Sequence, residues 1–401
     1  MTSEHHDLII IGGGVGGSAL AGAMAEAGAN VLVVEAETQF RDRVRGEAIM
    51  PWGVSEAKAL GLEETLAKAG ANPLIYWDSY QGADRSGHRD LVTTTKAGEA
   101  VQACYHPDLQ EALLRRAEGL GATVRRGARV TGLSQEQVPV VTAEFRGRAS
   151  KLTARLVVGA DGRGSPVRTW AGFEVKRDPE QILVAGVLLE GVSLSEDATH
   201  AWLDTSTGYF VLNFPQGNGR TRAYLCYPAA TEKRFSGRSD FPEMLGQSVR
   251  AGVPPDVYAN AKPVGPLATF DGRSVWTDRA YRNGVALIGD AAANTDPTWG
   301  QGLSMTLRDT RVLRDQLLAT EDWKQASENY AESRQQYFGV VHTMENWQTR
   351  LLMETGPEAD ARRAKAFPTW WEDRTRNPDT FLSGPGEPLD EAARRRFFGE
   401  D

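Results

Sequence analysis

Residues 7–17 decide the fold: Asp-Leu-Ile-Ile-Ile-Gly-Gly-Gly-Val-Gly-Gly. The apolar, β-branched first half predicts a strand that is buried on both faces. The glycines form a turn, and the alanine-rich segment that ends at Gly28 predicts the helix that follows it. A second apolar run, residues 31–34, predicts another buried strand that closes at Glu35. Together these segments predict one complete βαβ unit.

Gly12, Gly14 and Gly17 have the spacing of a nucleotide-binding turn. Glycines at these positions allow the tight turn, the close approach of a pyrophosphate to the backbone, and close packing of the helix. The first turn of the helix then offers unpaired N–H groups and a partial positive charge to the phosphates. Glu35 lies about twenty residues further on, where an acid accepts hydrogen bonds from ribose hydroxyls. The pattern favours FAD or NAD over a glycine loop without a ligand, but it does not separate the two cofactors.

The composition sets limits on the partners of the chain. Its 401 residues suffice for two or three domains, and the net charge of −8 argues against a nucleic-acid surface. Cys104 and Cys226 are far apart, which excludes a CxxC redox pair and disfavours a metal–thiolate site. The N-terminal residues show no secretory signal, and residues 8–34 break into short elements rather than one membrane span. We expect a cytoplasmic protein without a metal ion, a nucleic-acid partner or a membrane span.

Periodicity and turn signals predict the remaining elements. Helices are expected over residues 54–69, 108–120 and from 302 past 352, and strands near residues 74–80, 91–95, 124, 130, 140–145, 156–159 and 285–288. Residues 182–228 are strand-rich, contain Asn218-Gly219 as a hairpin turn, and predict one extended sheet distinct from the nucleotide fold. The tail from Phe367 is expected to wrap the surface, with the basic run 394–396 on a solvated helix face.

Two later segments separate the two cofactors. Residues 159–168 are Gly-Ala-Asp-Gly-Arg-Gly-Ser-Pro-Val-Arg, and residues 289–302 contain Gly-Asp-Ala-Ala followed by Pro297, Gly300, Gln301 and Gly302. With Asp309 and the first glycine motif, these segments resemble the ordered motifs of the FAD-dependent aromatic hydroxylases. This family comprises the group A flavoprotein monooxygenases of the para-hydroxybenzoate hydroxylase type. The resemblance extends over residues 12–309.

The resemblance implies an α/β fold in which a Rossmann-like FAD-binding domain is interleaved with a sheet-based substrate domain and followed by a helical C-terminal region. The expected boundaries are residues 1–72, 98–180 and 266–320 for the discontinuous FAD-binding domain, 73–97 and 181–265 for the substrate-binding sheet, and 321–401 for the C-terminal helices and tail. A second glycine motif with its own βαβ unit is missing from the sequence, which disfavours a two-site disulfide-reductase architecture.

The resemblance also implies a set of FAD-binding residues. Asp290 would hold a ribityl hydroxyl, Arg45 would lie near the phosphates or the ring, and Asp161 would serve the FAD. The alternatives are a surface position for Arg45 and a simple turn at Asp161-Gly162. The N–H groups of Leu303 and Ser304 would face the pyrimidine edge of the flavin, where a positive helix end favours reduction. The expected cofactor-binding residues are Gly12, Gly14, Gly17, Glu35, Arg45, His106, Val130, Asp161, Asp290, Pro297, Gly300, Gly302, Leu303 and Ser304.

Three positions depart from the motifs of the family. His106 stands where arginine is usual; a neutral imidazole gives a weaker phosphate contact, and the alternative is a residue at the start of a helix that contacts no ligand. Asp296 and Trp299 stand where an uncharged and a small residue are common. Either they face the flavin and narrow its pocket, or they pack and cap at the domain interface. The expected pocket residues are Tyr209, Asn213, Asp296, Pro297 and Trp299, with core packing as the alternative for Tyr209. No catalytic side chain is assigned because the flavin carries the chemistry.

The resemblance implies a monooxygenase that uses NADPH or NADH as a transient electron donor, and O2, to hydroxylate a small aromatic or similar planar molecule. One alternative is a reductase of the prenyl-reductase type, which acts on a C=C bond. Another is a two-component oxygenase or halogenase that receives reduced FAD from a flavin reductase partner, although the WxWxIP segment of the halogenases is missing. A non-catalytic binder in the manner of the GDP-dissociation inhibitors is disfavoured by the motif at residues 289–302.

Overall fold

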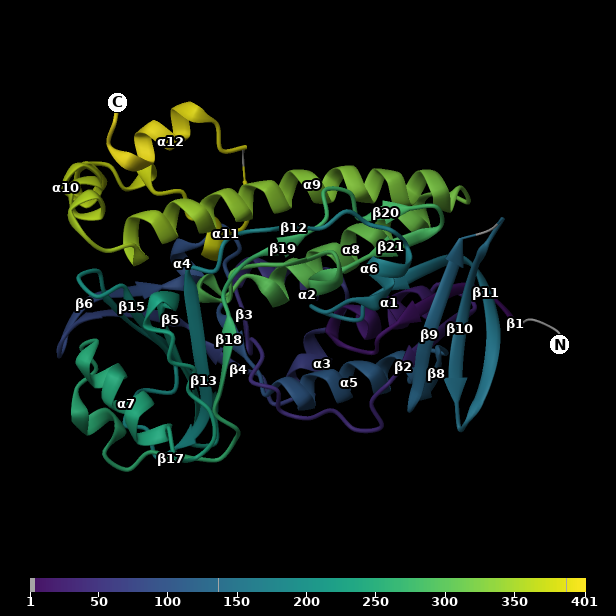
Figure 1. Cartoon of the computed structure of the whole chain (residues 1–401), viewed down its shortest axis with the longest axis horizontal. Helices are drawn as coiled ribbons and strands as arrows, with labels where there is room; N and C mark the ends of the chain where they lie inside the picture. Colours follow the sequence, from purple (N-terminus) through teal and green to yellow (C-terminus); the bar gives the residue numbers. More distant parts are fainter. Residues whose placement is uncertain (1–3, 136, 387) are drawn as a thin grey trace.

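The N-terminal segment folds as the predicted βαβ unit (Figure 1). The computed structural model describes residues 4–135, 137–386 and 388–401, and in it β1 spans Glu4–Ile11, α1 Val15–Glu26 and β2 Val31–Glu35. β1 and β2 are parallel neighbours, with Leu8 opposite Val31. The strand–turn–helix arrangement that the first glycine motif requires is therefore present.

The first sheet continues this parallel arrangement on both sides of β1. Its order is β20-β21-β11-β1-β2-β8, and β10 and β9 extend it from β11. The strands β11, β1, β2 and β8 lie parallel, and so does β21 beside β11. The bounds are β8 Thr123–Arg126, β9 Ala128–Gln135, β10 Pro139–Phe145, β11 Arg148–Gly159, β20 Tyr281–Arg282 and β21 Val285–Leu287. This sheet confirms the Rossmann-like part of the predicted fold.

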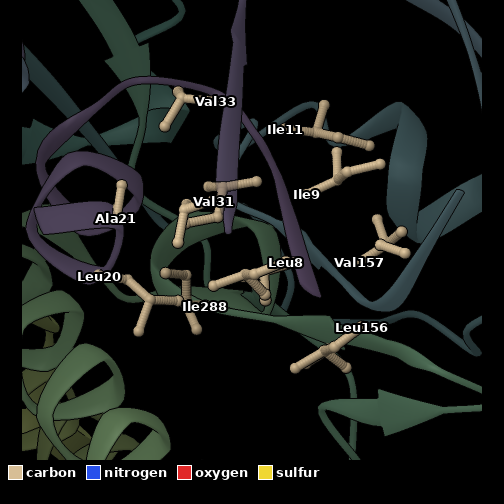
Figure 2. Close-up of a cluster of buried hydrophobic side chains, with 14 of the residues drawn as sticks. Leu8, Ile9, Ile11, Leu20, Ala21, Val31, Val33, Leu156, Val157 and Ile288 are labelled. Atoms are coloured by element: carbon tan, nitrogen blue, oxygen red, sulfur yellow. The ribbon is translucent and has the colours of Figure 1, made fainter. Parts of the chain in front are cut away.

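Apolar side chains from these strands and from α1 form the core of this half (Figure 2). Leu8, Ile9 and Leu20 are fully buried, and so are Val33 and Val157 on the neighbouring strands. Each such side chain contributes roughly 1.5–3 kcal/mol when it is removed from water. The continuous apolar runs of these strands follow from their place in a sheet that is covered on both faces.

The second sheet takes its strands from separated parts of the chain. Its order is β17-β13-β16-β15-β14-β5-β6, and β18 pairs with β13. The hairpin between β15 and β16 turns at Asn218 and Gly219, with φ of 55° and 70°, which confirms the predicted turn. The bounds are β5 Tyr76–Gln81, β6 Asp84–Asp90, β13 Ile182–Glu190, β14 Ala198–Asp204, β15 Tyr209–Gly217, β16 Arg220–Pro228, β17 Lys262–Pro263 and β18 Ala268–Asp271. The predicted extended sheet is therefore confirmed, and it also includes β18, from a segment that the sequence assigned to the cofactor domain.

Helices cover both sheets and connect them (Figure 1). α8 (Gly302–Ala319) packs against α1 and against α9 (Trp323–Gln348), and α9 continues into a π-helical turn over Thr349–Met353. α7 (Phe241–Arg250) covers the far face of the second sheet. The other helices are α2 Pro51–Ala59, α3 Glu63–Lys68, α4 Leu91–Thr94, α5 His106–Gly119, α6 Pro166–Trp170, α10 Pro357–Glu372, α11 Thr380–Ser383 and α12 Glu391–Phe398. The short strands β3 Ala48–Ile49, β4 Asn72–Leu74, β7 Val101–Ala103, β12 Lys176–Arg177, β19 Val275–Trp276 and β22 Ala293–Asn294 form two small sheets.

Two predictions from the sequence were wrong in detail. The segment predicted as a strand at residues 91–95 instead forms the short helix α4 over Leu91–Thr94, because the Asp90 side chain accepts hydrogen bonds from the backbone N–H groups of Val92 and Thr93. This cap overrides the β-propensity of the segment. The tail is not only a surface wrap: Phe397 and Phe398 of α12 are buried against Trp347 of α9. Within the described residues, no helix is long and apolar enough to cross a membrane.

The close packing of α1 on the glycine turn predicts that a methyl group added at Gly17 destabilises the protein. A Cβ at Gly17 would collide with the carbonyl oxygen of Gly12, which is backbone and has no room to shift. We expect Gly17→Ala to lower the free energy of unfolding by about 1–3 kcal/mol, measured by urea titration. Gly119→Ala is the matched control because nothing lies within 4 Å of its Cβ. Equal stability of the two variants would contradict this account of the turn.

Candidate active site

A cavity of about 680 Å³ opens between the two sheets. It is lined by the first turns of α1 and α8, the loop around Arg45, the second sheet, and the C-terminal segment 377–382. Its size lies within the ordinary range for cofactor and substrate sites. The cavity therefore brings together segments from the beginning, middle and end of the chain.

The N-terminus of α1 forms one end of this cavity. Gly14, Val15 and Gly16 line it, and the first turn of α1 has neither an acidic residue nor a side-chain cap. Its backbone N–H groups are thus left for an anion. Glu35 lies beside the turn, where its carboxylate accepts hydrogen bonds of 2.6 Å from the N–H groups of Gly13 and Glu37. These two bonds fix the acid at the end of β2.

The N-terminus of α8 lines the same cavity through Gly302 and Leu303. The helix has no side-chain cap, and the chain reaches it through Gly300, whose φ of 68° suits glycine. The Gln301 side chain is held elsewhere: its Oε1 accepts from Trp52 Nε1 at 3.1 Å and its Nε2 donates to the Trp299 carbonyl at 2.6 Å. The N–H groups at the start of α8 therefore remain available. Ser304 is buried behind them, and its Oγ accepts from the Met50 N–H.

Asp290 lies in the turn that follows β21 and lines the cavity. The turn is fixed by Asp309, whose Oδ2 accepts from the Gly289 N–H at 2.9 Å. Asp309 in turn accepts hydrogen bonds from Arg334 Nε at 3.1 Å and Tyr337 Oη at 2.6 Å. Burial raises the pKa of Asp290, and the charge of Arg45 opposes this shift. The carboxylate thus lies at the cavity, where it can accept a hydrogen bond from a hydroxyl group of a ligand.

A buried ion pair fixes the loop that carries Arg45. Arg222 of β16 is fully buried, and its Nε and Nη2 donate to the two Glu47 carboxylate oxygens at 2.7 and 2.9 Å. Nη2 also donates to Asp42 Oδ2 at 2.9 Å. Burial raises the pKa of Glu47, and the Arg222 charge opposes that shift. The sequence did not indicate this pair, because an arginine within a strand is ordinarily an exposed residue.

His106 occupies the cavity wall at the start of α5. Its Nδ1 lies 3.0 Å from the Gly46 carbonyl oxygen, so that nitrogen carries the proton in this contact. Burial lowers the pKa of His106 to about 4, which makes the imidazole neutral at pH 7. The side chain can therefore hydrogen-bond a ligand but does not bring a positive charge to it.

Several residues expected at the cofactor site support the cavity without lining it. Gly12 and Gly17 belong to the turn between β1 and α1, and Val130 of β9 packs against the hydrophobic core of the first sheet. Asp161 accepts hydrogen bonds from Ser165 Oγ at 2.6 Å and the Val167 N–H at 3.0 Å, and it fixes the turn in which Gly162 has φ of 79°. Gly14, Arg45, His106, Asp290, Pro297, Gly300, Gly302 and Leu303 line the cavity itself.

Tyr209 and Asn213 lie on the face of the second sheet that is turned away from the cavity. Phe210, Leu212 and Phe214 line the cavity. Tyr209 packs with the cluster under α7, and Asn213 is buried with its Oδ1 accepting from Tyr258 Oη. Neither Tyr209 nor Asn213 lines the pocket for which it was a candidate. The alternation of side chains along β15 separates the two sets, and sequence alone does not tell which face the cavity meets.

Asp296 and Trp299 have different environments. Trp299 lines the cavity beside Pro297, stacks on Phe381, and donates from Nε1 to Thr349 Oγ1 at 3.0 Å. Asp296 does not line it: its carboxylate caps the turn at the Thr298 N–H and borders a separate small cavity with Glu345. Burial raises the pKa of Asp296 to about 6. The indole thus narrows the large cavity, whereas the acid packs behind it.

One part of the cavity wall, formed by residues near the C-terminus, was not predicted from the sequence. Gln348 and residues 377–382 form it, although they lie beyond the motifs of the family. Phe381 and Leu382 belong to α11, which a composition rich in proline, glycine and charge does not predict.

The residues present fit FAD. Two helix N-termini with uncapped N–H groups line one cavity, and Asp290, in the turn after β21, lines the same cavity. Glycines at positions 14 and 302 leave space for a close ligand. A Cβ at Gly14 or Gly302 would have neighbours no nearer than 3.6 and 3.9 Å, respectively. Among the described residues, no cluster of His, Cys, Asp or Glu is arranged to hold a metal ion.

Comparison with known proteins identifies the family. Residues 5–337 match the family model described as FAD binding domain. The chain belongs to this family. It is an FAD-dependent oxidoreductase whose relatives include monooxygenases.

The relatives of this chain differ in the reactions that their names state. The chain is 27% identical over 360 residues to the rifampicin monooxygenase of Streptomyces venezuelae, with 89% of this chain and 74% of that protein covered. It is 28% identical over 315 residues to the digeranylgeranylglycerophospholipid reductase 2 of Methanopyrus kandleri, with 75% of this chain and 74% of that protein covered. Among solved structures, p-nitrophenol 4-monooxygenase of Pseudomonas putida DLL-E4 superposes with a TM-score of 0.80 at 19% identity, covering 96% of this chain and 100% of that one. That superposition establishes the shared fold.

The Arg222 ion pair predicts a large loss of stability in one variant. We expect Arg222→Leu to lower the free energy of unfolding by about 3–5 kcal/mol, because Glu47 would be left charged and unpaired in the interior. Arg220→Leu is the matched control on the same strand, since the Arg220–Glu190 pair is exposed and should contribute only about 0–1 kcal/mol. Urea unfolding of both variants measures the difference, and similar losses would contradict a structural role for the buried pair.

The lowered pKa of His106 predicts a pH-dependent contribution to stability. Protonation favours the unfolded chain, so the contribution is present above pH 6.5 and is lost as the pH falls from 6.5 toward 4. We expect the FAD-free His106→Gln variant to lose less stability than the wild type between pH 7.5 and 4.5, as measured by urea midpoints. His5→Gln, at an exposed position, should follow the wild-type curve. Parallel curves for His106→Gln and the wild type would overturn this assignment.

Proposed function

We propose that the protein is an FAD-dependent monooxygenase that uses NADPH or NADH and O2 to hydroxylate a small aromatic or similar planar molecule. One observation carries the proposal: a single cavity joins the N-termini of α1 and α8 and continues to aromatic side chains of the second sheet. In this proposal one FAD molecule reaches both helix ends, and the aromatic end of the same cavity takes a second, planar ligand.

In this proposal the N-termini of α1 and α8 bind different parts of the FAD molecule. The Val15 and Gly16 N–H groups bind the pyrophosphate, and Glu35 accepts from the ribose hydroxyls. Asp290 accepts a ribityl hydroxyl, Arg45 adds positive charge near the phosphates or ring, and the α8 N-terminus faces the ring. His106, being neutral, adds a hydrogen bond rather than charge. FAD supplies the redox chemistry with the nicotinamide donor and O2 when it is bound.

The chain's own contribution to the reaction is to position the substrate and exclude water. Phe210, Trp299 and Phe381 form an apolar wall, with ring centroids 6.0 Å apart for Phe210 and Trp299 and 5.3 Å apart for Trp299 and Phe381. Aromatic side chains in a cavity wall favour a flat ligand. A dry wall also protects reactive species from water.

A reductase acting on a C=C bond is the second candidate, and the similarity to the Methanopyrus kandleri reductase favours it. An oxygenase or halogenase supplied with reduced FAD by a partner is the third. The aromatic wall supports the monooxygenase, because it favours a planar ligand over a long flexible prenyl chain.

Stopped-flow reduction of the FAD-loaded protein tests the proposal. Under anaerobic conditions NADPH or NADH should bleach the bound flavin, and a suitable member of a phenol panel should accelerate bleaching at least tenfold. With ¹⁸O2, one labelled oxygen atom should then appear in the product. Failure of both nicotinamides to reduce the flavin directly would favour an oxygenase or halogenase that receives reduced FAD from a partner. Anaerobic turnover of an alkene would favour the reductase.

A further inference from the structure

We propose that Trp299 determines the length of the ligand that the large cavity accepts, because its indole ring is a fixed partition between this cavity and the small cavity that Asp296 and Glu345 border. Ligands that extend beyond the indole are excluded. This inference rests on the proposed function, in which FAD occupies the part of the cavity at α1 and α8 and the ligand lies at the aromatic end.

The indole of Trp299 is held in one position. Its Nε1 donates to Thr349 Oγ1 at 3.0 Å, and its ring stacks on Phe381 with 5.3 Å between centroids and an interplanar angle of 21°. The ring of Phe210 lies 6.0 Å away, centroid to centroid. The indole can leave this position only by losing the hydrogen bond and these aromatic contacts. Since it lines the cavity with 9% of its surface exposed, Trp299 presents a rigid surface to a ligand.

The backbone that carries the indole is fixed as well. The Trp299 carbonyl oxygen accepts from Gln301 Nε2 at 2.6 Å. Asp296 Oδ1 accepts from the Thr298 N–H at 2.9 Å and caps the turn, and the ring of Pro297 restricts its own φ. The turn therefore leaves the partition little freedom to move away from an incoming ligand.

A second cavity lies on the other side of this partition. Its volume is about 20 Å³, and its wall includes Asp296, Glu345 and Thr349. Because Thr349 accepts the indole N–H and also lines the small cavity, the indole ring and the Thr349 side chain lie between the two cavities. A cavity of this size holds about one water molecule. Removal of the indole would open the large cavity towards this space.

The two cavities differ in polarity. Burial raises the pKa of Asp296 to about 6 and that of Glu345 well above its ordinary value, and neighbouring carboxyl groups add to both shifts. Arg273 also lines the small cavity, but its guanidinium is paired with two other carboxylates. Buried acids of this kind favour water and polar groups over apolar ones. The indole thus keeps an apolar ligand apart from a polar space as well as limiting its length.

Two planar alcohols that differ by one fused ring test this inference with the FAD-loaded protein. The probes are 2-naphthylmethanol and 2-anthrylmethanol, each titrated by the perturbation of the flavin spectrum. The wild type should bind the anthryl compound about tenfold or more weakly than the naphthyl compound. In Trp299→Ala the ratio of the two dissociation constants should fall by about tenfold or more, because the third ring enters the space of the indole. An unaltered ratio, or binding of neither probe to either protein, would overturn the inference.

Indole tests whether the space opened in Trp299→Ala is the place of the partition. Indole should raise the Tm of the FAD-loaded Trp299→Ala variant and leave that of the wild type unchanged. 1-Methylindole should raise it less, because it lacks the N–H group that would replace the donation to Thr349 Oγ1. Equal shifts with the two compounds, or no shift with either, would contradict this placement of the partition.

Trp371→Ala is the matched control, because Trp371 is 81% exposed and the substitution is the same. It should leave the ratio of dissociation constants at the wild-type value. Trp299→Leu removes most of the indole but keeps an apolar side chain, so it supplies the same ratio if Trp299→Ala does not fold. If neither nicotinamide reduces the flavin, the proposed function fails while the ratio still tests Trp299. If the flavin is reduced and the ratio is unaltered, this inference alone fails.

Discussion

The site depends on the parallel direction of β1, β11 and β21. Parallel strands end at one edge of their sheet, so the turns after Ile11, Gly159 and Leu287 meet there. The first of these turns leads into α1, and α8 begins at Gly302 after β22; the first N–H groups of both helices lack side-chain caps. A Cβ at Gly12 would collide with the Ala160 carbonyl, which shows how closely the first two turns approach. Reversing β1 would move the N-terminus of α1 to the far edge of the sheet and away from the cavity.

The second constraint joins the two sheets electrostatically. Arg222 extends from β16 to Glu47 and Asp42 in the loop that carries Arg45. Such a buried pair gives little net stability, because desolvation offsets much of the attraction. Its effect is geometric: it fixes a loop of otherwise irregular backbone, in which Val44 has a φ of 53°, against the sheet that forms the opposite wall. The loop around Arg45 and the second-sheet wall of the cavity are thereby held in a fixed relative position.

The C-terminal segment completes the site at the end farthest from the nucleotide turn. Arg89 and Asp379 connect it to β6, and the Phe381 carbonyl accepts a hydrogen bond from Gln301 at 3.3 Å. Gln301 begins the α8 turn, so the same residue contacts both the helix end and the tail. Variation in a tail of this kind can change the outer wall of the cavity without altering the turns at the N-termini of α1 and α8, because its contacts are with that wall.

The sequence by itself determined the βαβ unit, the parallel strands and the glycine turn at the start of α1, because local rules govern these features. Apolar runs specify buried strands, glycines are required where backbone approaches a phosphate, and Asn218-Gly219 specifies its turn. Tertiary structure alone decided which face of β15 meets the cavity, that Arg222 is buried with Glu47, and that Gln348 and Phe381 reach the site. These outcomes depend on how distant segments pack. A period-two strand offers two equivalent faces, and an arginine or a glutamine carries no local sign of the partner that the fold will bring to it.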